Sequence, residues 1–375
     1  MKKLHRRPNR FKGASVGLDL HISFIQYSIL DQPGDERAND RVPADREQLL
    51  ALIDQLEAEH GPLQVAFEAS GSFLWVFDLL VERLDRDRVH VAAPSKVKAI
   101  ANSQEKNDAN DAWWLAYLLW EARLPEAFVA EGTLRDLRTA CREVRDLIDR
   151  GNDLKRRMRG ALRQLGLSLG ARSDWHTIVG HGRIQRIVEQ AQAEHGLQGE
   201  AIARMWTRIQ EMAEETAYWE QHVERLAAEF DQVEVLKTEM PGVGDRIGPV
   251  VIGELGDPRR FHSAKAYAKA TGLTPGYRES GGRRSTKKIS RCGSAHVRWA
   301  LTQAVMGCLR RKNGPGLAVK AWVDRLARRK GKKSAIVAAA RKLAEAIWRL
   351  FNLGEAFDLT RSFGGPAMVE AGRKL

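Results

Sequence analysis

The stretch SVGLDLHISFIQYSIL, residues 15–30, decides the fold of the first part of the chain. Apolar residues fill both halves of this stretch and flank a short polar centre, a pattern that predicts two β-strands joined by a tight turn. Asp19 interrupts the first strand between Leu18 and Leu20. A carboxylate at such a place is costly unless something cationic meets it. The stretch therefore predicts a sheet and, within it, a candidate functional residue.

Further strands and helices follow this pair of strands. The sequences QVAFEA at 64–69 and RVHVAA at 88–93 predict two more strands. Helical spacing of apolar residues predicts helices over 46–60, 73–84 and 108–123, the last ending before Pro125. Strands that alternate with helices indicate a mixed α/β domain, which we assign to residues 1–130.

After Pro125 the pattern changes to long helices. Two series of residues recur at alternating four- and three-residue steps, which is typical of a heptad seam. Together they predict a coiled-coil or helical insert over residues 131–234, folded back as a hairpin or paired with another copy of the chain. An ordinary helical bundle without a role in assembly is the alternative. The two series are Leu137, Cys141, Val144, Ile148, Gly151, Lys155, Met158, Leu162 and Leu165, and Met205, Ile209, Met212, Thr216, Trp219, Val223, Leu226 and Phe230.

The charge of the chain favours a polyanionic partner. Among 375 residues there are 61 Lys and Arg against 48 Asp and Glu, a formal net charge of +13. Ten basic residues lie between 310 and 333 against Asp324 alone, and seven lie between 278 and 298 against Glu279 alone. Such blocks indicate nucleic acid rather than only a solvated surface.

Other classes of protein are disfavoured. The longest apolar stretches are shorter than the ~20 residues that span a bilayer, and no signal peptide is evident, so we expect a cytoplasmic protein without a membrane helix. The three cysteines, Cys141, Cys292 and Cys308, form no CxxC pair and have no His at ligand spacing. Neither a disulfide framework nor a zinc site is therefore predicted.

Residues 235–375 predict a mainly α-helical C-terminal domain. The turn Pro241-Gly242-Val243-Gly244 lies between helical stretches, like the turn of a helix-hairpin-helix, and lets the backbone N–H groups of Gly242 and Gly244 approach a phosphate. A basic, glycine-rich loop follows at 277–284, and helices are predicted over 295–310 and 316–350. We assign a set of basic residues to contacts with a nucleic-acid backbone: Arg278, Arg283, Arg284, Lys287, Lys288, Arg291 and Arg298.

Four carboxylates of the first domain are candidates for metal chemistry. Glu68 ends a predicted strand, as Asp19 lies on one, and Asp108 and Asp111 are three residues apart at the start of a helix. Hard Mg²⁺ or Mn²⁺ ions bind such oxygen-rich groups, and two ions ~4 Å apart stabilise phosphodiester displacement. Alternatively, Asp108 caps its helix and Asp111 interacts with the helix dipole, but capping does not explain acids on strands.

These residues resemble a known family, the DEDD-type insertion-sequence transposases, which are related to the Piv and MooV DNA invertases and whose studied members are recombinases guided by a bridge RNA. The resemblance covers nearly the whole chain. It is specific because several motifs occur in the family's order. They are Gly17-Leu18-Asp19, FEASG at 67–71, KNDANDA at 106–112, MPGVG at 240–244, ELGDPRRF at 254–261, ATGLTP at 270–275 and ESGG at 279–282.

The resemblance implies a RuvC-like, ribonuclease H-type fold for the first domain, with Asp19, Glu68, Asp108 and Asp111 as its metal-binding tetrad. It also implies that Ser280 is a nucleophile that holds a DNA strand covalently. Two glycines after Ser280 leave room for a duplex, and the neighbouring arginines can neutralise phosphoryl oxygens. Ser285, Ser290 and Ser294 are competing serines without a motif match.

We therefore expect a Mg²⁺- or Mn²⁺-dependent DNA transposase that acts on donor and target DNA in the cytoplasm, associated with the nucleoid. The resemblance adds a structured noncoding guide RNA as a partner. Exchange between two duplexes favours a homo-oligomer, a dimer of dimers held partly by the coiled coil. The alternatives are a Holliday-junction nuclease that uses water, a site-specific DNA invertase, and a nucleic-acid-binding protein without catalysis.

Overall fold

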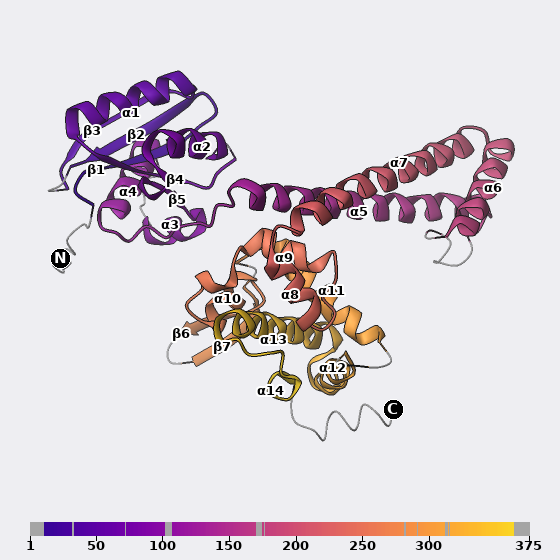
Figure 1. Ribbon diagram of the computed structural model, residues 1–375. Helices are drawn as coiled ribbons and strands as arrows, with labels where there is room; N and C mark the ends of the chain where they lie inside the picture. The colour runs from indigo at the N-terminus through magenta and orange to yellow at the C-terminus, as the bar shows by residue number, and fades with distance from the viewer. Residues whose placement is uncertain are drawn as a thin grey trace. The chain divides into compact units, whose positions relative to one another are not determined.

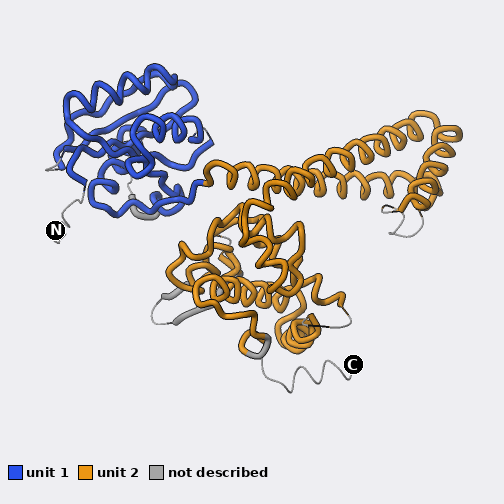
Figure 2. Tube along the Cα trace, viewed as in Figure 1, with its two compact units in different colours: residues 1–129 blue, residues 130–375 orange. Residues whose placement is uncertain are grey.

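The structure is a computed structural model of the chain. It describes residues 11–31, 34–71, 73–101, 107–169, 175, 177–280, 283–290, 292–311, 314 and 316–363. For residues 99–101, 277–280, 283–288, 359 and 360 it describes the backbone alone. The chain divides into two compact units, residues 1–129 and residues 130–375, which are coloured separately in Figure 2. Each unit is described by itself.

The first unit is built on a five-stranded mixed sheet in the order β3-β2-β1-β4-β5. The central strand β1 pairs antiparallel with β2 and parallel with β4, and Leu18 lies opposite Phe67 in the parallel pair. The strands β4 and β5 are also parallel, whereas β3 is antiparallel to β2. The strands are β1 Ala14–Leu20, β2 Phe24–Leu30, β3 Glu36–Pro43, β4 Leu63–Glu68 and β5 Val89–Ala92.

Helices cover both faces of this sheet. On one face, α1 and α2 pack against the apolar side chains of the strands in a common core. On the other face, α4 packs against Ala66 and Ala92 through Leu115 and its neighbours. This arrangement is compatible with the ribonuclease H-type fold that the resemblance implies. The helices are α1 Arg46–His60, α2 Phe73–Leu84, the short η1 Arg86–Arg88, α3 Pro94–Ala101 and α4 Asp108–Trp120 (Figure 1).

The second unit begins with a helical hairpin. The long helices α5, Gly132–Gln164, and α7, Gly196–Ala227, run side by side, and α6, Ile178–Glu194, closes their far end (Figure 1). Apolar residues of all three helices, among them Met158, Ile184 and Trp206, form a separate core at this end. Of the predicted heptad positions on α5, Leu137, Cys141, Val144, Gly151, Met158 and Leu162 are buried.

The remaining helices of the second unit share one core with the near ends of α5 and α7. A two-stranded antiparallel sheet, β6 and β7, lies between α10 and α11 in the chain. The elements are α8 Asp231–Glu239, α9 Ile247–Leu255, η3 Pro258–Arg260, α10 Ala264–Ala270, β6 Pro275–Ser280, β7 Arg283–Ile289, α11 Ala295–Arg310, α12 Gly316–Lys330, α13 Lys332–Leu353 and α14 Leu359–Phe363. In the described part of the chain, no helix is both long and apolar enough to cross a membrane.

The structure differs from the sequence-based expectations in several elements. Of the predicted loop over 277–284, residues 277–280 belong to β6 and residues 283–284 to β7. The predicted helix over 316–350 is two helices that meet at Gly331, whose φ is +80°. Glycine adopts a positive φ without steric strain, and a residue in this conformation interrupts an α-helix. Among the elements that the sequence did not predict are the polar edge strand β3, the short helices α3 and α10, and the helix α6.

Candidate functional site

The acids of β1 and β4 lie on the sheet face that α4 covers. Leu18 and Phe67 are buried in the core under α1 and α2. Side chains alternate between the two faces of a strand, so Asp19 and Glu68, each one residue later, project to the opposite face. Because β1 and β4 are parallel and adjacent, both acids lie at the carboxyl edge of the sheet. Each acid is only partly buried, so this edge remains open to solvent.

Helix α4 lies unusually close to β1. A β-carbon added to Gly17 would overlap the carbonyl oxygen of Ala112 and lie 2.5 Å from the amide nitrogen of Ala116. Asn107 fixes the start of the helix, because its side chain accepts a hydrogen bond of 2.8 Å from the amide of Asn110. Asp108 and Asp111 therefore occupy the first turn of a helix whose backbone rests directly on the strand that bears Asp19.

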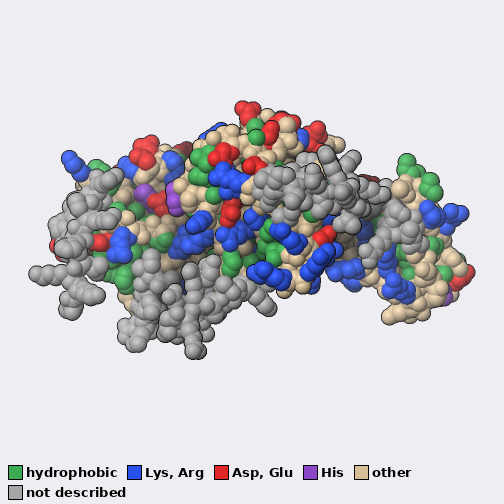
Figure 3. All heavy atoms as spheres, turned by 90° about the horizontal axis from the view of Figure 1, so that it is seen from below, with side chains coloured by type: hydrophobic (Ala, Val, Ile, Leu, Met, Phe, Trp, Pro, Cys, Tyr) green, Lys and Arg blue, Asp and Glu red, His purple; other side chains and the backbone are tan. Residues whose placement is uncertain are grey.

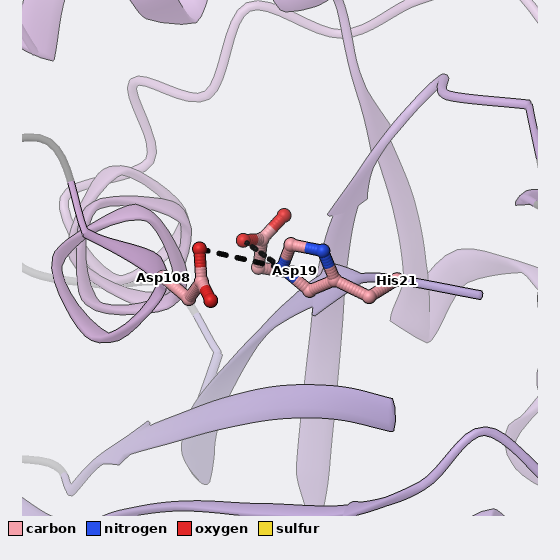
Figure 4. A group of neighbouring side chains, drawn as sticks. All are labelled: Asp19, His21 and Asp108. Carbon is pink, nitrogen blue, oxygen red and sulfur yellow. Dashed lines mark hydrogen bonds and ion pairs between the residues drawn. The ribbon is translucent and has the colours of Figure 1, made fainter. Parts of the chain in front are cut away.

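The resulting cluster joins two acids and a histidine, shown in Figure 4. Nε2 of His21 lies 3.1 Å from Oδ2 of Asp19 and 3.4 Å from Oδ1 of Asp108. One ligand atom from each of the three residues lies within 4.8 Å of the others. The ring of His21 stacks on Phe24 with a centroid distance of 4.4 Å, which fixes the imidazole at the turn between β1 and β2.

Electrostatics link a fourth residue to this cluster. Burial raises the pKa of the Asp19 carboxyl above its ordinary value, and the charges of Asp111 and Asp108 raise this pKa further. His21 acts in the opposite direction through its charge and its hydrogen bond to Asp19. The elevated pKa of Asp19 is the expected result of crowding acids in a partly desolvated place. A bound cation would relieve this repulsion.

The structure places two of the four acids predicted in the first unit in one cluster and the other two beside it. Asp19 and Asp108 share the cluster, whereas Glu68 and Asp111 are not members of it among the described residues. Glu68 ends the neighbouring strand β4, and Asp111 lies one turn along α4. Sequence reasoning missed His21, which lies one residue beyond β1; its only signal was its place two residues after Asp19.

The donor set fits a divalent cation. Asp19, His21 and Asp108 can provide one ligand atom each. Asp108 is exposed to solvent, so an ion at this place could also bind water. Carboxylate oxygens suit Mg²⁺ and Mn²⁺, and an imidazole nitrogen is accepted more readily by Mn²⁺ than by Mg²⁺. The described residues therefore supply a suitable place for such an ion at the edge of the sheet.

Ser280 lies in the second unit, at the end of β6. The backbone of Ser280 pairs with that of Arg283 across the β6–β7 hairpin, and Ser285 pairs with Arg278. The side chains of Arg278, Ser280, Arg283, Arg284, Lys287 and Lys288 fall outside the described residues, as do Gly281, Gly282 and Arg291 in full. Arg298 is described on α11, where its guanidinium donates a 2.7 Å hydrogen bond to the carbonyl of Gly293.

The two glycines of the turn between α8 and α9 have different surroundings. Gly242 has a φ of +78°, and a β-carbon there would overlap the carbonyl oxygen of Ala304 on α11. Close packing of the turn on α11 is therefore a structural reason for Gly242. At Gly244, a β-carbon would meet nothing within 4 Å. Gly244 is thus the more open of the two candidate phosphate contacts.

A buried carboxylate connects α9 with two other elements. Glu254 is 7% exposed and accepts hydrogen bonds from Arg142 at 2.7 and 3.1 Å and from the hydroxyl of Ser294 at 2.9 Å. Burial alone would raise the pKa of Glu254, but these donors and the charge of Arg138 lower it below its ordinary value. Since Ser294 also caps α11, Glu254 ties the long helix α5 to the segment that follows β7. The sequence identified Glu254 only as part of a motif.

Comparisons with known families agree with the distribution of these residues. Residues 16–166, which contain the whole acidic cluster, match a family described as "Transposase", the DEDD transposases of the IS110 type. Residues 234–319, which contain β6, β7 and Glu254, match a family described as "Transposase IS116/IS110/IS902 family". The two matches follow each other in the chain and together cover more than half of it.

Individual relatives are also named as transposases. The chain is 25% identical over 270 residues to the transposase for insertion sequence element IS1111A of Coxiella burnetii, covering 71% of each chain. It is 23% identical over 346 residues to a Pseudomonas aeruginosa protein whose name refers to family 20 transposases, covering 90% of this chain and 96% of that protein. A Sinorhizobium fredii protein, also named after transposases, is 32% identical over 120 residues, which is 31% of its length. From the two family matches and these relatives, we conclude that the chain belongs to the IS110-type family of DEDD transposases, a family of DNA-rearranging enzymes.

Proposed function

We propose that this protein is the transposase of an insertion sequence and that it exchanges DNA strands through a covalent bond between Ser280 and DNA. The observation that carries the proposal is the meeting of Asp19 and Asp108 at one edge of the sheet, within a chain of this family. Acids held this close, with the pKa of Asp19 raised, are typical of a site that binds a cation for phosphoryl transfer.

The proposed architecture assigns a task to each part of the chain. Residues 1–130 form a RuvC-like domain whose tetrad Asp19, Glu68, Asp108 and Asp111 holds Mg²⁺ or Mn²⁺. Residues 131–234 form a coiled-coil insert that helps to assemble a dimer of dimers, and residues 235–375 form the transposase domain with a helix-hairpin-helix-like turn. The basic residues of 278–298 hold the DNA backbone. The long α5–α7 hairpin supports the second assignment.

The proposed reaction is a phosphoryl transfer between hydroxyl groups. Oγ of Ser280 forms a bond to the DNA phosphorus as the bond from phosphorus to one strand oxygen breaks, and the serine proton ends on that departing hydroxyl. A hydroxyl of the partner strand then displaces Ser280 by the reverse reaction. Because one phosphoester bond replaces another, no external energy source is needed. A divalent cation at the acids would supply Lewis-acid stabilisation of the charge on the phosphoryl oxygens.

Substitution of the nucleophile tests this reaction. Ser280→Ala should yield no protein-linked DNA and no strand exchange in a gel assay with a substrate carrying the element's ends. Ser285→Ala, on the neighbouring strand of the same hairpin, is the matched control and should retain both activities. Asp19→Ala should abolish strand exchange while leaving DNA binding in place. A protein-linked product that persists in Ser280→Ala would contradict the proposal.

The alternatives predict different results with the same variants. A junction nuclease that uses water would still cleave DNA as Ser280→Ala and would lose cleavage as Asp19→Ala. A non-catalytic binding protein would show no cleavage in the unsubstituted protein. A DNA invertase would form the covalent product but would invert a segment between two sites instead of mobilising the element.

We further propose that a structured noncoding RNA selects the donor and target DNA by base pairing, while the protein holds backbone and shape. Support for this partner comes from the resemblance and from the basic character of the chain. Sequencing of the nucleic acid that copurifies with the protein tests the proposal. A defined RNA encoded beside the gene is the expected result, and random cellular RNA would contradict it.

A further inference from the structure

One face of α5 carries arginines along most of its length. Arg138, Arg145, Arg156 and Arg163 are separated by 7, 11 and 7 residues. An α-helix has 3.6 residues per turn, so steps of 7 and 11 residues each return to within about 20° of the same direction. The four side chains therefore form a single row on α5.

The arginines in the near half of this row contact other helices of the second unit. Arg138 donates hydrogen bonds to the carbonyls of Gly253 and Glu254 at 2.9 and 3.1 Å. Arg145 places its guanidinium 4.0 Å from the ring centroid of Trp299 on α11. On this half of the helix, the basic side chains thus meet groups of α9 and α11.

The far half of the row continues beyond those contacts. Arg156 and Arg163 are exposed there, and the guanidinium of Arg156 lies 2.9 Å from the exposed carboxylate of Asp153. Exposed ion pairs of this kind contribute little, typically below about 1 kcal/mol, and are easily exchanged for another anion. Residues 154–165, on the far half of α5, include five basic residues and no acid, and Lys155, Arg157 and Arg159 flank the row.

Two further cations are held in place beside the row. Nζ of Lys155 and the guanidinium of Arg159 lie 5.4 and 5.6 Å from the ring centroid of Trp175. Within the described residues, Nε of Arg159 is buried and has no hydrogen-bond acceptor. The charges of Lys155 and Arg159 add to the positive potential beside the row.

The surface view agrees with this count. In Figure 3, Lys and Arg side chains cover much of the middle of this face and continue toward the side where Figure 1 draws the far ends of α5 and α7. Carboxylates are sparse on the part of this face that the figure shows. A patch of one sign on a projecting helix attracts a polyanion and positions it over the helix.

We propose that the far half of α5, from Lys155 to Arg163, is a second binding surface for the phosphate backbone of duplex DNA. Arg156 and Arg163 are two turns apart, or about 10 Å along the axis. This spacing is close to the ~12 Å width of the B-DNA major groove, so the two guanidinium groups suit phosphates on its opposite rims. The major groove of A-form RNA is narrow and deep, which makes DNA the better fit. The choice of DNA rests on the proposed function, but the surface is separate from the tetrad and Ser280.

The salt dependence of binding tests this surface in the full-length protein. The double variant Arg156→Ala/Arg163→Ala should reduce the slope of log K against log salt for a random-sequence DNA duplex by about 1.8, from two phosphate contacts of ~0.9 each. The ratio of the DNA affinity of the unsubstituted protein to that of the variant should accordingly fall about tenfold between roughly 50 and 200 mM salt. Circular dichroism of the variant should match that of the unsubstituted protein, because both side chains are exposed.

A matched control removes the same charge from the same hairpin. Arg204→Ala/Arg208→Ala changes two exposed arginines on α7, of which Arg204 pairs with Glu200, and should leave the slope unchanged. Equal slopes for the unsubstituted protein and the α5 variant would overturn the proposal, as would an equal reduction in both double variants. A reduction seen with duplex RNA but not with duplex DNA would overturn the choice of DNA. Failure of the Ser280 reaction instead appears as lost protein-linked DNA with an unchanged salt slope.

Discussion

Gly17 on β1 and Ala112 on α4 are in direct backbone contact. A β-carbon at Gly17 would overlap the carbonyl oxygen of Ala112, so only glycine lets the helix lie this close to the strand. The consequence is functional, because Asp19 follows Gly17 by two residues on the same face of β1, and Asp108 precedes Ala112 by one turn of α4. The contact between Gly17 and Ala112 therefore sets the separation of the acids.

Enlarging Gly17 should damage both the fold and the site. We expect Gly17→Ala to lower the free energy of unfolding by about 1–3 kcal/mol, since α4 must move away from β1 to admit the methyl group. Denaturant unfolding followed by circular dichroism measures this loss. Gly160→Ala on α5 is the control, because a β-carbon at Gly160 would meet nothing within 4 Å. An unchanged free energy of unfolding in Gly17→Ala would show that the sheet and α4 are not in such close contact.

Removal of the imidazole should weaken cation binding. Nε2 of His21 is within 3.4 Å of both Asp19 and Asp108, so it binds or orients the ligands of the cluster. We expect His21→Ala to reduce the affinity for Mn²⁺ by about 10- to 100-fold in a calorimetric titration, as is typical when a supporting group of a metal site is lost. His60→Ala, at the end of α1 beside the exposed Glu59, should bind Mn²⁺ as the unsubstituted protein does. Equal affinities for all three proteins would exclude His21 from the site.

Stability at acid pH should depend on Glu254. The pKa of this carboxyl is lower in the folded protein than in an unfolded chain, so its ion pair with Arg142 stabilises the fold fully above the unfolded pKa of about 4.3. This contribution is lost as the pH falls through the lower pKa of the folded state. Glu254→Gln should lower the free energy of unfolding at pH 7 by about 1–3 kcal/mol.

The pH dependence supplies the check on that assignment. Unfolding free energies of both proteins, measured from pH 7 down to pH 3, should converge at the acid end, because protonated Glu254 resembles glutamine. Glu345→Gln is a suitable control, since Glu345 forms an i,i+4 pair with Arg341 on α13 and should give a smaller loss. A constant difference between Glu254→Gln and the unsubstituted protein at every pH would place the effect elsewhere.

The glycines of the α8–α9 turn should respond differently to the same substitution. Gly242→Ala introduces a side chain at a φ of +78° and against Ala304, and should cost about 2 kcal/mol or more of stability. Gly244→Ala has open space and should change stability by less than about 0.5 kcal/mol. If the amide of Gly244 contacts a phosphate, as we propose, Gly244→Ala should still weaken DNA binding. Fluorescence anisotropy with labelled DNA measures this, and unaltered binding would remove Gly244 from the interface.

Local sequence signals determined many elements of the fold. The bounds of α1 and α2 agree with the residues predicted, and the start of α1 is marked by Asp45, whose carboxylate accepts hydrogen bonds from the amides of Glu47 and Gln48. The strand β3 escaped prediction because it is an exposed edge strand with mostly polar residues, held by pairing with β2. The sequence of the β6–β7 hairpin predicts a loop instead of strands, because it is charged, contains glycines and shows no apolar alternation.

What the sequence by itself determined was therefore the set of elements with strong apolar periodicity, the acids placed against that pattern and the concentration of positive charge. Only the tertiary structure decided which acids meet, since the approach of α4 to Gly17 and the turn that carries His21 depend on contacts between segments far apart in the chain. It also decided which arginines of α5 are used in packing against α9 and α11 and which are left exposed. The physical reason is that periodicity encodes the face on which a residue lies, whereas the neighbour opposite that face is set by long-range packing.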